Sequence, residues 1–248
     1  MVADAGRLGT RRHIIHALIE IDVTDARRFI RGVKAETGRS LSFTAFLLCC
    51  LARAIEAHPN VCAYKTRGMR GRRLILFNEV DIVTMIETEI DGVALPHVVR
   101  AANRKSYEVI SDEIGTVRSN PGHSKQTGGL SRWGARLPWF VRDIFYRIIL
   151  SNPHRFKRYA GTAIVTAVGM FTRGGGWGIG FLPMHTLGLT VGGLVQRPAF
   201  VGDTIAAREY LSVTISFDHD VVDGAPAARF VDYFRQLVED GACLRGVV

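Results

Sequence analysis

The segment Leu211–Gly241 reads LSVTISFDHDVVDGAPAARFVDYFRQLVEDG and joins two structural patterns at one polar corner. Its first part is rich in β-branched and aromatic residues, which predicts a strand. From Gly224 onward the apolar residues predict a helix, with Gly241 as its C-cap. Between strand and helix lies His219, flanked by two aspartates and followed four residues later by Asp223.

The function of this corner depends on the role of His219. Histidine is the side chain whose pKa suits proton transfer near neutral pH, and at a strand end it can point into a cleft. A carboxylate at Asp223 can pair with an arginine and hold the loop, while Gly224 permits close approach of the backbone. The alternative is a solvated polar turn, and on spacing alone that alternative is the commoner case.

Predicted strands and helices alternate along the rest of the sequence. Residues 13–23 predict a strand, and Thr24 is the expected N-cap of the helix that follows. A second, nearly all-apolar helix is expected between Ser42 and Pro59. Further strands are expected within 61–67, 72–87, 91–99, 161–171, 185–195 and 208–220, and a helix within 105–119 with Ser106 as its cap.

The order of these elements predicts an α/β fold, a two-layer sandwich with a mixed β-sheet covered by helices. Residues 1–248 are expected to form a single domain, with 1–12 flexible. Residues 119–158 are atypical, because a polar, glycine-rich stretch precedes an amphipathic helix at 137–150. That helix is expected to cover the sheet or a subunit interface, with a membrane surface as the alternative.

Composition limits the possible ligands and the location. The 32 Lys and Arg residues exceed the 23 Asp and Glu residues, for a net charge of +9. The charges lack a nucleic-acid-binding pattern, so a phosphate-rich cofactor or an acidic partner protein is expected and nucleic acid is not. The four cysteines lack metal-ligand spacing, so no metal is expected, and a reducing, cytoplasmic setting fits them. No signal peptide or membrane span is apparent, so membrane association is not expected.

The segment Leu211–Gly241 closely resembles the end of the catalytic domain in acyltransferase subunits of 2-oxo acid dehydrogenase complexes, the dihydrolipoamide acyltransferases. That family shows Ser-Phe-Asp-His-Arg, two variable residues, Asp-Gly-Ala, and then Ala-Arg-Phe. Chloramphenicol acetyltransferase shares the His-x-x-x-Asp-Gly core. Residues 13–29, 38–63, 91–114 and 161–171 resemble other parts of the family. The resemblance implies the chloramphenicol acetyltransferase-like fold of coenzyme A-dependent acyltransferases.

The resemblance also implies roles for three residues. His219 would be the general base that deprotonates an attacking thiol, and Asp223 would hold the active-site loop through a salt bridge. Thr166 falls where the family has a serine or threonine that stabilises the oxyanion of the tetrahedral intermediate. The alternative for Thr166 is an ordinary β-branched strand residue. Coenzyme A would be the co-substrate, and the protein would be a homotrimer or a multiple of three with active sites between subunits.

The sequence departs from the family at several positions. Asp220 stands where arginine is usual, and a carboxylate facing His219 would favour the protonated imidazole, whereas one pointing away would not. Ala167 replaces an asparagine. We expect no lipoyl domain, linker or subunit-binding domain to precede the catalytic segment. We therefore expect no lipoyl attachment on this chain, and a lipoyl-bearing or acyl-carrier protein as a partner.

Three functions remain open from the sequence. The first is transfer of an acyl group between coenzyme A and a thiol such as dihydrolipoyl. The second is acylation of a hydroxyl or amine on a small molecule, and the third is a non-catalytic trimeric assembly protein. Asp220 is the best support for the third, while retention of His219, Asp223 and a hydroxyl at residue 166 opposes it. No motif identifies the acyl group, because the shape of a pocket determines it.

Overall fold

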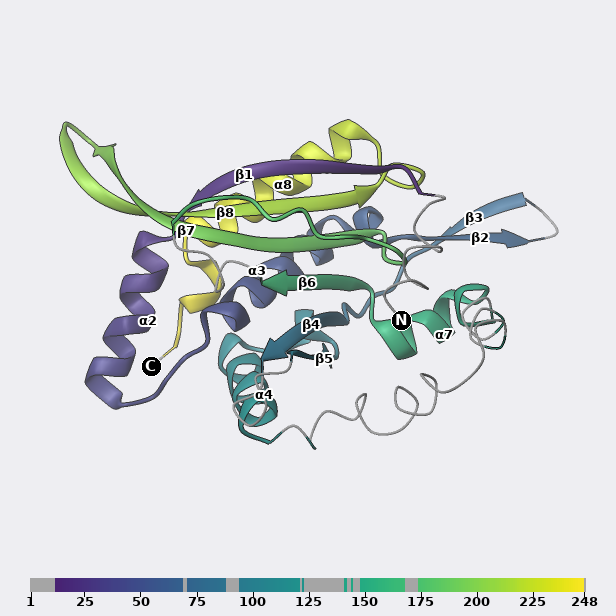
Figure 1. The fold of residues 1–248 in the computed structure, drawn as a ribbon, viewed down its shortest axis with the longest axis horizontal. Coiled ribbons are helices and arrows are strands. Elements are labelled where there is room, and N and C mark those ends of the chain that lie inside the picture. The colour runs from purple at the N-terminus through teal and green to yellow at the C-terminus, as the bar shows by residue number, and fades with distance from the viewer. Residues whose placement is uncertain are drawn as a thin grey trace.

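The computed structural model describes residues 12–68, 71–87, 94–120, 122, 141, 144, 148–167 and 174–247. Its main feature is a six-stranded mixed sheet with the strand order β1-β8-β7-β6-β4-β5 (Figure 1). These strands are β1 (Ile14–Asp22), β4 (Ile82–Glu87), β5 (Ala94–Val99), β6 (Ala163–Ala167), β7 (Leu187–Val201) and β8 (Thr204–Asp218). Strands β2 (Tyr64–Gly68) and β3 (Gly71–Ile75) form a separate hairpin that extends away from the sheet.

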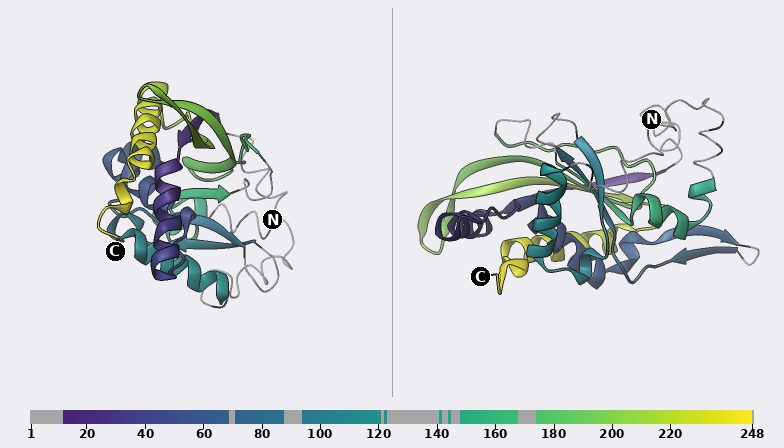
Figure 2. Two further views of the ribbon diagram at one scale, coloured as in Figure 1. Left: turned by 90° about the vertical axis from the view of Figure 1, so that its left-hand side faces the viewer. Right: turned by 90° about the horizontal axis from the view of Figure 1, so that it is seen from below.

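Four helices lie together on one side of the sheet (Figure 2, left). They are α2 (Thr24–Thr37), α3 (Phe43–Ala57), α4 (Tyr107–Ser119) and α8 (Gly224–Glu239). A shorter helix, α7 (Pro153–Ala160), precedes β6, and 3-10 turns occur at Pro59–Cys62, Ala102–Arg104 and Ala242–Leu244. Sheet and helices form the two layers of the predicted α/β arrangement.

The core lies between these two layers. Helix α3 is its centre, and ten of its fifteen residues are buried, as its nearly continuous apolar sequence predicts. In the second half of β8 the odd-numbered residues are buried under the helices: Leu211, Val213, Ile215 and Phe217. Successive strand residues point to opposite faces, so the even-numbered residues of β8 lie on the other side of the sheet. We call that side the open face.

Several predicted boundaries are confirmed and others differ. Ser42 and Ser106 cap α3 and α4, as predicted. Thr24 is not an N-cap: it is the first residue of α2, and its hydroxyl donates to Asp22 instead. Pro96 lies within β5, which an edge strand tolerates because one side needs no ladder hydrogen bond.

Strands β7 and β8 are longer than predicted, since their pairing continues to Val201 and Thr204. A two-residue turn joins them, and Gly202 at φ 60° supplies the left-handed conformation that such turns require. Of residues 1–12, expected to be flexible, only Arg12 is described, and it is held by hydrogen bonds. Most of the predicted helix at 137–150 lies outside the described residues.

Candidate active site

His219 lies directly after β8, in the loop that leads to α8. Its backbone N–H donates to the carbonyl oxygen of His13 at 2.7 Å, which extends the pairing of β1 and β8 by one residue. The side chain is 43% exposed. A rigid strand end therefore presents a solvent-accessible imidazole, as the sequence predicts.

Asp223 lies at the start of α8, where its carboxylate accepts the N–H of Gly224 at 2.7 Å. Its Oδ1 lies 4.0 Å from Nε2 of His219, and the side chain is 86% exposed. Among the described residues, His219 is the ion-pair neighbour of Asp223. No described arginine forms the salt bridge with Asp223 that the resemblance implies. The role of Asp223 in holding the loop stays a prediction.

Asp218 is a buried carboxylate that the sequence analysis did not single out. Its Oδ2 accepts from Arg12 at 2.9 Å, and its Oδ1 accepts the backbone N–H of Asp220 at 3.1 Å. Its carbonyl oxygen accepts from Val221 and Val222 at 2.9 and 3.0 Å. Asp218 thus fixes the loop around His219 from inside. The pairing with Arg12 spans 206 residues, so no local pattern could have indicated it.

Asp220 points toward His13. Its Oδ1 lies 3.2 Å from Nδ1 of that histidine, while its carbonyl oxygen accepts from Nζ of Lys65 at 2.8 Å. Of the two orientations considered from the sequence, the structure thus shows the one in which the carboxylate turns away from His219.

A second histidine, His185, is buried beneath this loop. Its Nε2–H donates to the carbonyl oxygen of Ala160 at 2.8 Å, and its own carbonyl oxygen accepts from Arg12. Burial lowers the pKa of His185 to about 4, so the ring is neutral at physiological pH. Its Nδ1 is buried without a partner among the described residues.

Thr166 lies on the open face, in the middle of the sheet. Strand register aligns it with Thr190 on β7 and Thr214 on β8, so three threonines form a row across three strands. A pocket of about 250 Å³ opens beside Thr166. The described helices α2, α3, α4 and α8 are on the opposite side of the sheet, so they leave this pocket uncovered.

The hydroxyl groups around this pocket differ in their partners. Thr190 accepts the N–H of Gly180 through its Oγ1 at 3.2 Å, and Oγ of Ser216 lies 2.8 Å from Nδ1 of His16. Thr166 has no hydrogen-bond partner for its hydroxyl among the described residues. It is therefore the hydroxyl of this pocket that is available to a ligand.

Residues 174–182 cross the open face close to β7, and Gly180, Phe181 and Leu182 form one wall of the pocket. The N–H of Gly193 donates to the carbonyl oxygen of Gly176 at 2.8 Å, and Nε1 of Trp177 donates to the carbonyl oxygen of Ile19 at 3.1 Å. A Cβ at Gly192 would collide with the carbonyl oxygen of Gly176, so this close approach requires glycine.

The structure does not bring Thr166 and His219 together within one chain. Thr166 is level with Thr214, and His219 lies five residues beyond Thr214 along β8. At about 3.3 Å per residue and about 4.8 Å between strands, the two residues are about 19 Å apart. If they act on the same acyl group, they must come from different copies of the chain.

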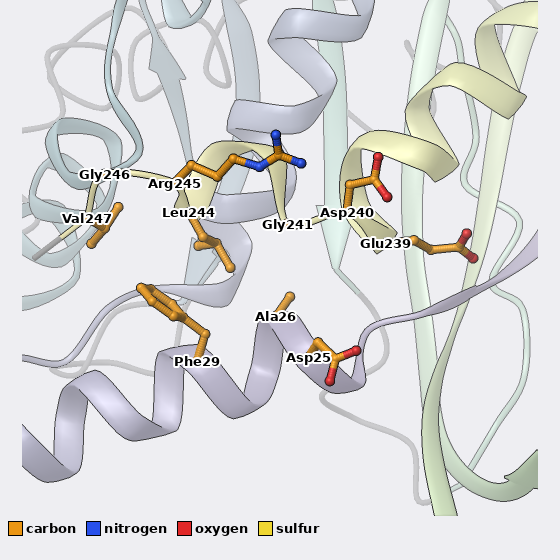
Figure 3. A pocket seen from close by; sticks show the side chains of 10 residues that line it. All are labelled: Asp25, Ala26, Phe29, Glu239, Asp240, Gly241, Leu244, Arg245, Gly246 and Val247. Atoms are coloured by element: carbon orange, nitrogen blue, oxygen red, sulfur yellow. The ribbon is translucent and has the colours of Figure 1, made fainter. Parts of the chain in front are cut away.

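A second pocket, of about 360 Å³, lies between the first turn of α2 and the residues that follow α8 (Figure 3). It is at the opposite end of α8 from His219, and that helix of sixteen residues is about 24 Å long. Asp25 at its edge is already paired with Arg28 and Arg208. This pocket is therefore separate from the candidate site.

Comparison with known families shows to which family the chain belongs. Residues 12–126 and 156–244 match the family described as "2-oxoacid dehydrogenases acyltransferase (catalytic domain)". The chain belongs to this acyltransferase family. The internal stretch without a match, residues 127–155, falls within residues 119–158, whose sequence is atypical.

Curated relatives of this acyltransferase chain carry different acyl groups in their names. One is the dihydrolipoyllysine-residue succinyltransferase component of the 2-oxoglutarate dehydrogenase complex of Staphylococcus saprophyticus, 26% identical over 89% of this chain and 46% of the relative. Another is the dihydrolipoyllysine-residue acetyltransferase component of the pyruvate dehydrogenase complex of Zymomonas mobilis, 26% identical over 93% of this chain and 46% of the relative. The chain thus spans about half the length of these relatives.

Solved structures agree with the predicted fold. The cubic core of a pyruvate dehydrogenase multienzyme complex has a TM-score of 0.72 at 20% identity, covering 98% of this chain and 88% of that one. A dihydrolipoamide acetyltransferase of Azotobacter vinelandii, studied for the catalytic roles of a serine, a histidine and an asparagine, has a TM-score of 0.70 at 21% identity, with the same coverage. Chloramphenicol acetyltransferase has a TM-score of 0.53 at 14% identity, covering 96% and 93%. The fold is chloramphenicol acetyltransferase-like, as predicted.

In the described part of this acyltransferase chain, no three His, Cys, Asp or Glu side chains are grouped so that they could hold a metal ion. None of the helices described is long and apolar enough to cross a membrane.

Proposed function

We propose that this protein is a coenzyme A-dependent acyltransferase that moves an acyl group between coenzyme A and a thiol such as dihydrolipoyl. The observation that carries the proposal is the uncommitted hydroxyl of Thr166, which lines a pocket in the acyltransferase fold. A hydroxyl in such a place can donate to an oxyanion, while His219 offers an accessible base.

The proposed reaction needs one base and one hydrogen-bond donor. His219 takes the proton of the attacking thiol, and the thiolate adds to the carbonyl carbon of the acyl thioester. Thr166 donates its hydroxyl hydrogen to the resulting oxyanion. When the intermediate collapses, the carbon–sulfur bond to the departing thiol breaks, and the imidazolium of His219 returns a proton to that sulfur.

Residue spacing supports these assignments. In the Azotobacter vinelandii acetyltransferase, the histidine lies four residues before the asparagine and 52 residues after the serine. Here His219 lies four residues before Asp223 and, by subtraction, 53 residues after Thr166, one residue more than in that protein; residue 167, at a spacing of 52, is an alanine without a hydroxyl. An aspartate and a threonine would thus take the places of the asparagine and the serine.

The separation of the two residues supports a shared site. Because Thr166 and His219 are about 19 Å apart in one chain, we propose that each site combines Thr166 of one copy with His219 of another, in a homotrimer or a multiple of three. The open face has the surface for such an assembly, since Trp177, Ile179 and Phe181 are exposed on it. Exposed apolar residues in a group are typical of protein–protein contacts.

The remaining proposals concern the setting of this reaction. We propose residues 1–248 as one catalytic domain that acts in the cytoplasm. Its acceptor thiol would be presented by a separate lipoyl-bearing or acyl-carrier protein. The net charge of +9 suits the phosphates of coenzyme A or an acidic carrier.

Mixed oligomers test the shared site directly. His219→Ala and Thr166→Val chains, each with its own affinity tag, are co-expressed, and oligomers with both tags are isolated. Each variant alone is expected to be inactive with acetyl-CoA and dihydrolipoamide. In a trimer that contains both variants, one of the three interfaces joins an intact His219 to an intact Thr166. We therefore expect the isolated mixed trimers to regain about a third of wild-type activity, and no recovery would contradict the shared site.

The same assay with other acceptors tests the reaction. Candidate alcohols and amines replace dihydrolipoamide, and thiol release from acetyl-CoA is followed. Faster turnover with an alcohol or amine would favour the small-molecule acyltransferase instead. No release with any acceptor from a folded oligomer would favour the non-catalytic assembly protein.

A further inference from the structure

The relatives of this chain carry different acyl groups in their names, and a pocket lies beside Thr166. We infer that this pocket receives the substituent of the acyl group, and that this substituent is uncharged and aliphatic. The inference rests on the proposed function, because it takes Thr166 as the donor to the oxyanion.

The position of Thr166 determines what enters the pocket. An acyl oxygen that accepts from its hydroxyl places the carbonyl carbon at the mouth of the pocket. Besides this oxygen, the carbonyl carbon carries two substituents, the sulfur and the acyl chain. The sulfur must face the attacking thiol and His219, which come from a second copy outside the pocket. The acyl chain is then the substituent that points inward.

The pocket walls are apolar. Their side chains include Met85, Ile164, Phe181 and Leu182, and no charged side chain is found among the described residues that line the pocket. Gly188 contributes to this surface, because a Cβ there would lie 2.8 Å from Cδ1 of Leu182 and 3.3 Å from Cγ2 of Ile164. The two apolar side chains can close over the strand only because residue 188 is glycine.

The two other hydroxyl groups at the pocket cannot compensate a negative charge as a cation would. Thr190 is engaged with Gly180, and Ser216 is engaged with His16. Among the described residues that line this apolar space, a succinyl carboxylate would meet no positively charged partner, which is strongly unfavourable. Acetyl, propionyl and isobutyryl groups have no carboxylate that would have to lose its hydration.

The size of the pocket agrees with a small aliphatic group. Its volume of about 250 Å³ corresponds to about eight water molecules at about 30 Å³ each. An acyl chain of a few carbons fits this space.

A panel of acyl-CoA substrates tests the inference on the wild-type protein. Acetyl-, propionyl-, isobutyryl- and succinyl-CoA are compared with free dihydrolipoamide as the acceptor. We expect kcat/KM for succinyl-CoA to be at least tenfold below the best uncharged substrate. Equal or better use of succinyl-CoA would overturn the inference while leaving the transferase function intact. No use of any acyl-CoA would instead contradict the proposed function.

A charge placed at the edge of the pocket sharpens the test. Met85 is 37% exposed, so Met85→Arg can bring a cation to the edge of the pocket while its long side chain reaches water. We expect the ratio of succinyl-CoA to propionyl-CoA turnover to rise at least tenfold.

The matched control is Leu18→Arg. Leu18 is 47% exposed on the same face, in the row of Thr166, but it does not line the pocket. Its ratio should equal that of the wild type. An equal rise in both variants would show a general effect of charge, and it would contradict the pocket as the acyl site.

Discussion

The loop around His219 and the pocket around Thr166 are built on opposite principles. The loop is polar, and buried charge fixes it, since Asp218 binds both Arg12 and the backbone of the loop. The pocket is apolar, and strand register fixes it, since Thr166 is aligned with Thr190 and Thr214. One region presents a base to solvent, whereas the other keeps a hydroxyl beside hydrocarbon.

This difference matches the two demands of acyl transfer. A base must exchange protons with a thiol that arrives from solvent, so its side chain must be accessible. An oxyanion is stabilised best where water is excluded, because a hydrogen bond is stronger in a medium of low dielectric constant. A single strand end cannot offer both surroundings. In the proposed shared site, two copies of the chain bring the two surroundings together.

The largest expected effect follows from removing the base. We expect His219→Ala to lower kcat/KM for acetyl-CoA and dihydrolipoamide by about 10²–10⁴-fold, the usual contribution of general base catalysis. The oligomer should be unchanged in sedimentation, because the side chain is half exposed. His13→Ala serves as a control at the same corner and should retain nearly full activity. Undiminished acyl transfer by His219→Ala would show that the corner is only a polar turn.

The next effect distinguishes the pocket hydroxyl from its neighbours. We expect Thr166→Val to lower kcat by about 10²–10³-fold with little change in KM, because the hydroxyl contacts the oxyanion and not the bound ground state. The matched control is Thr214→Val, in the same row, whose hydroxyl is buried without a partner among the described residues. Its removal should leave activity unchanged. Equal activity of both variants would exclude Thr166 from the mechanism.

The two regions also differ in how far the sequence predicts them. His219 and the end of its strand are local features, so motif and polarity predict them. The ion pair of Asp218 with Arg12 joins positions 206 residues apart, and local patterns contain no information about it. The pocket at Thr166 depends on the register of three strands and on glycines that admit residues 174–182. Resemblance indicates that the hydroxyl of Thr166 matters, but only the assembled sheet shows that it has no other partner in the part of the chain that the structure describes.

The stability of the region beneath the His219 loop, where His185 is buried, should decrease in acid. Burial lowers the pKa of His185 from 6.5 to about 4. Below pH 6.5 the unfolded chain binds a proton at this residue that the folded chain does not bind. Stability should therefore fall between pH 6.5 and 4, by about 3 kcal/mol in total.

Chemical denaturation at pH 7, 5.5 and 4.5 measures this effect, with His185→Gln as the control. Glutamine can donate to the carbonyl of Ala160 but does not titrate, so the difference between the two proteins isolates His185. The wild type should lose more stability than the variant as the pH falls. Parallel loss in both proteins would contradict the assignment of a neutral, buried ring.

A smaller effect compares the two aspartates of the loop. We expect Asp218→Asn to destabilise the protein by about 2 kcal/mol, less than for a fully buried pair because Arg12 is partly exposed. Asp223→Asn should change stability by less than about 0.5 kcal/mol, since asparagine caps helices as well as aspartate does. Thermal unfolding of both variants measures the contrast. A greater loss of stability in Asp223→Asn than in Asp218→Asn would show that Asp223 is the residue that holds the loop.

The smallest expected effect concerns Asp220, the residue that departs from the family pattern. Its carboxylate contacts His13 at 3.2 Å and is 41% exposed. An exposed pair contributes about 0–1 kcal/mol, so Asp220→Asn should change stability little. Since the carboxylate points away from His219, the acidic limb of the pH profile of kcat/KM should stay in place. A shift of that limb to lower pH would mean that Asp220 turns toward His219 in the working oligomer. The aspartate would then restrain the base, and its replacement by asparagine should raise activity below neutral pH.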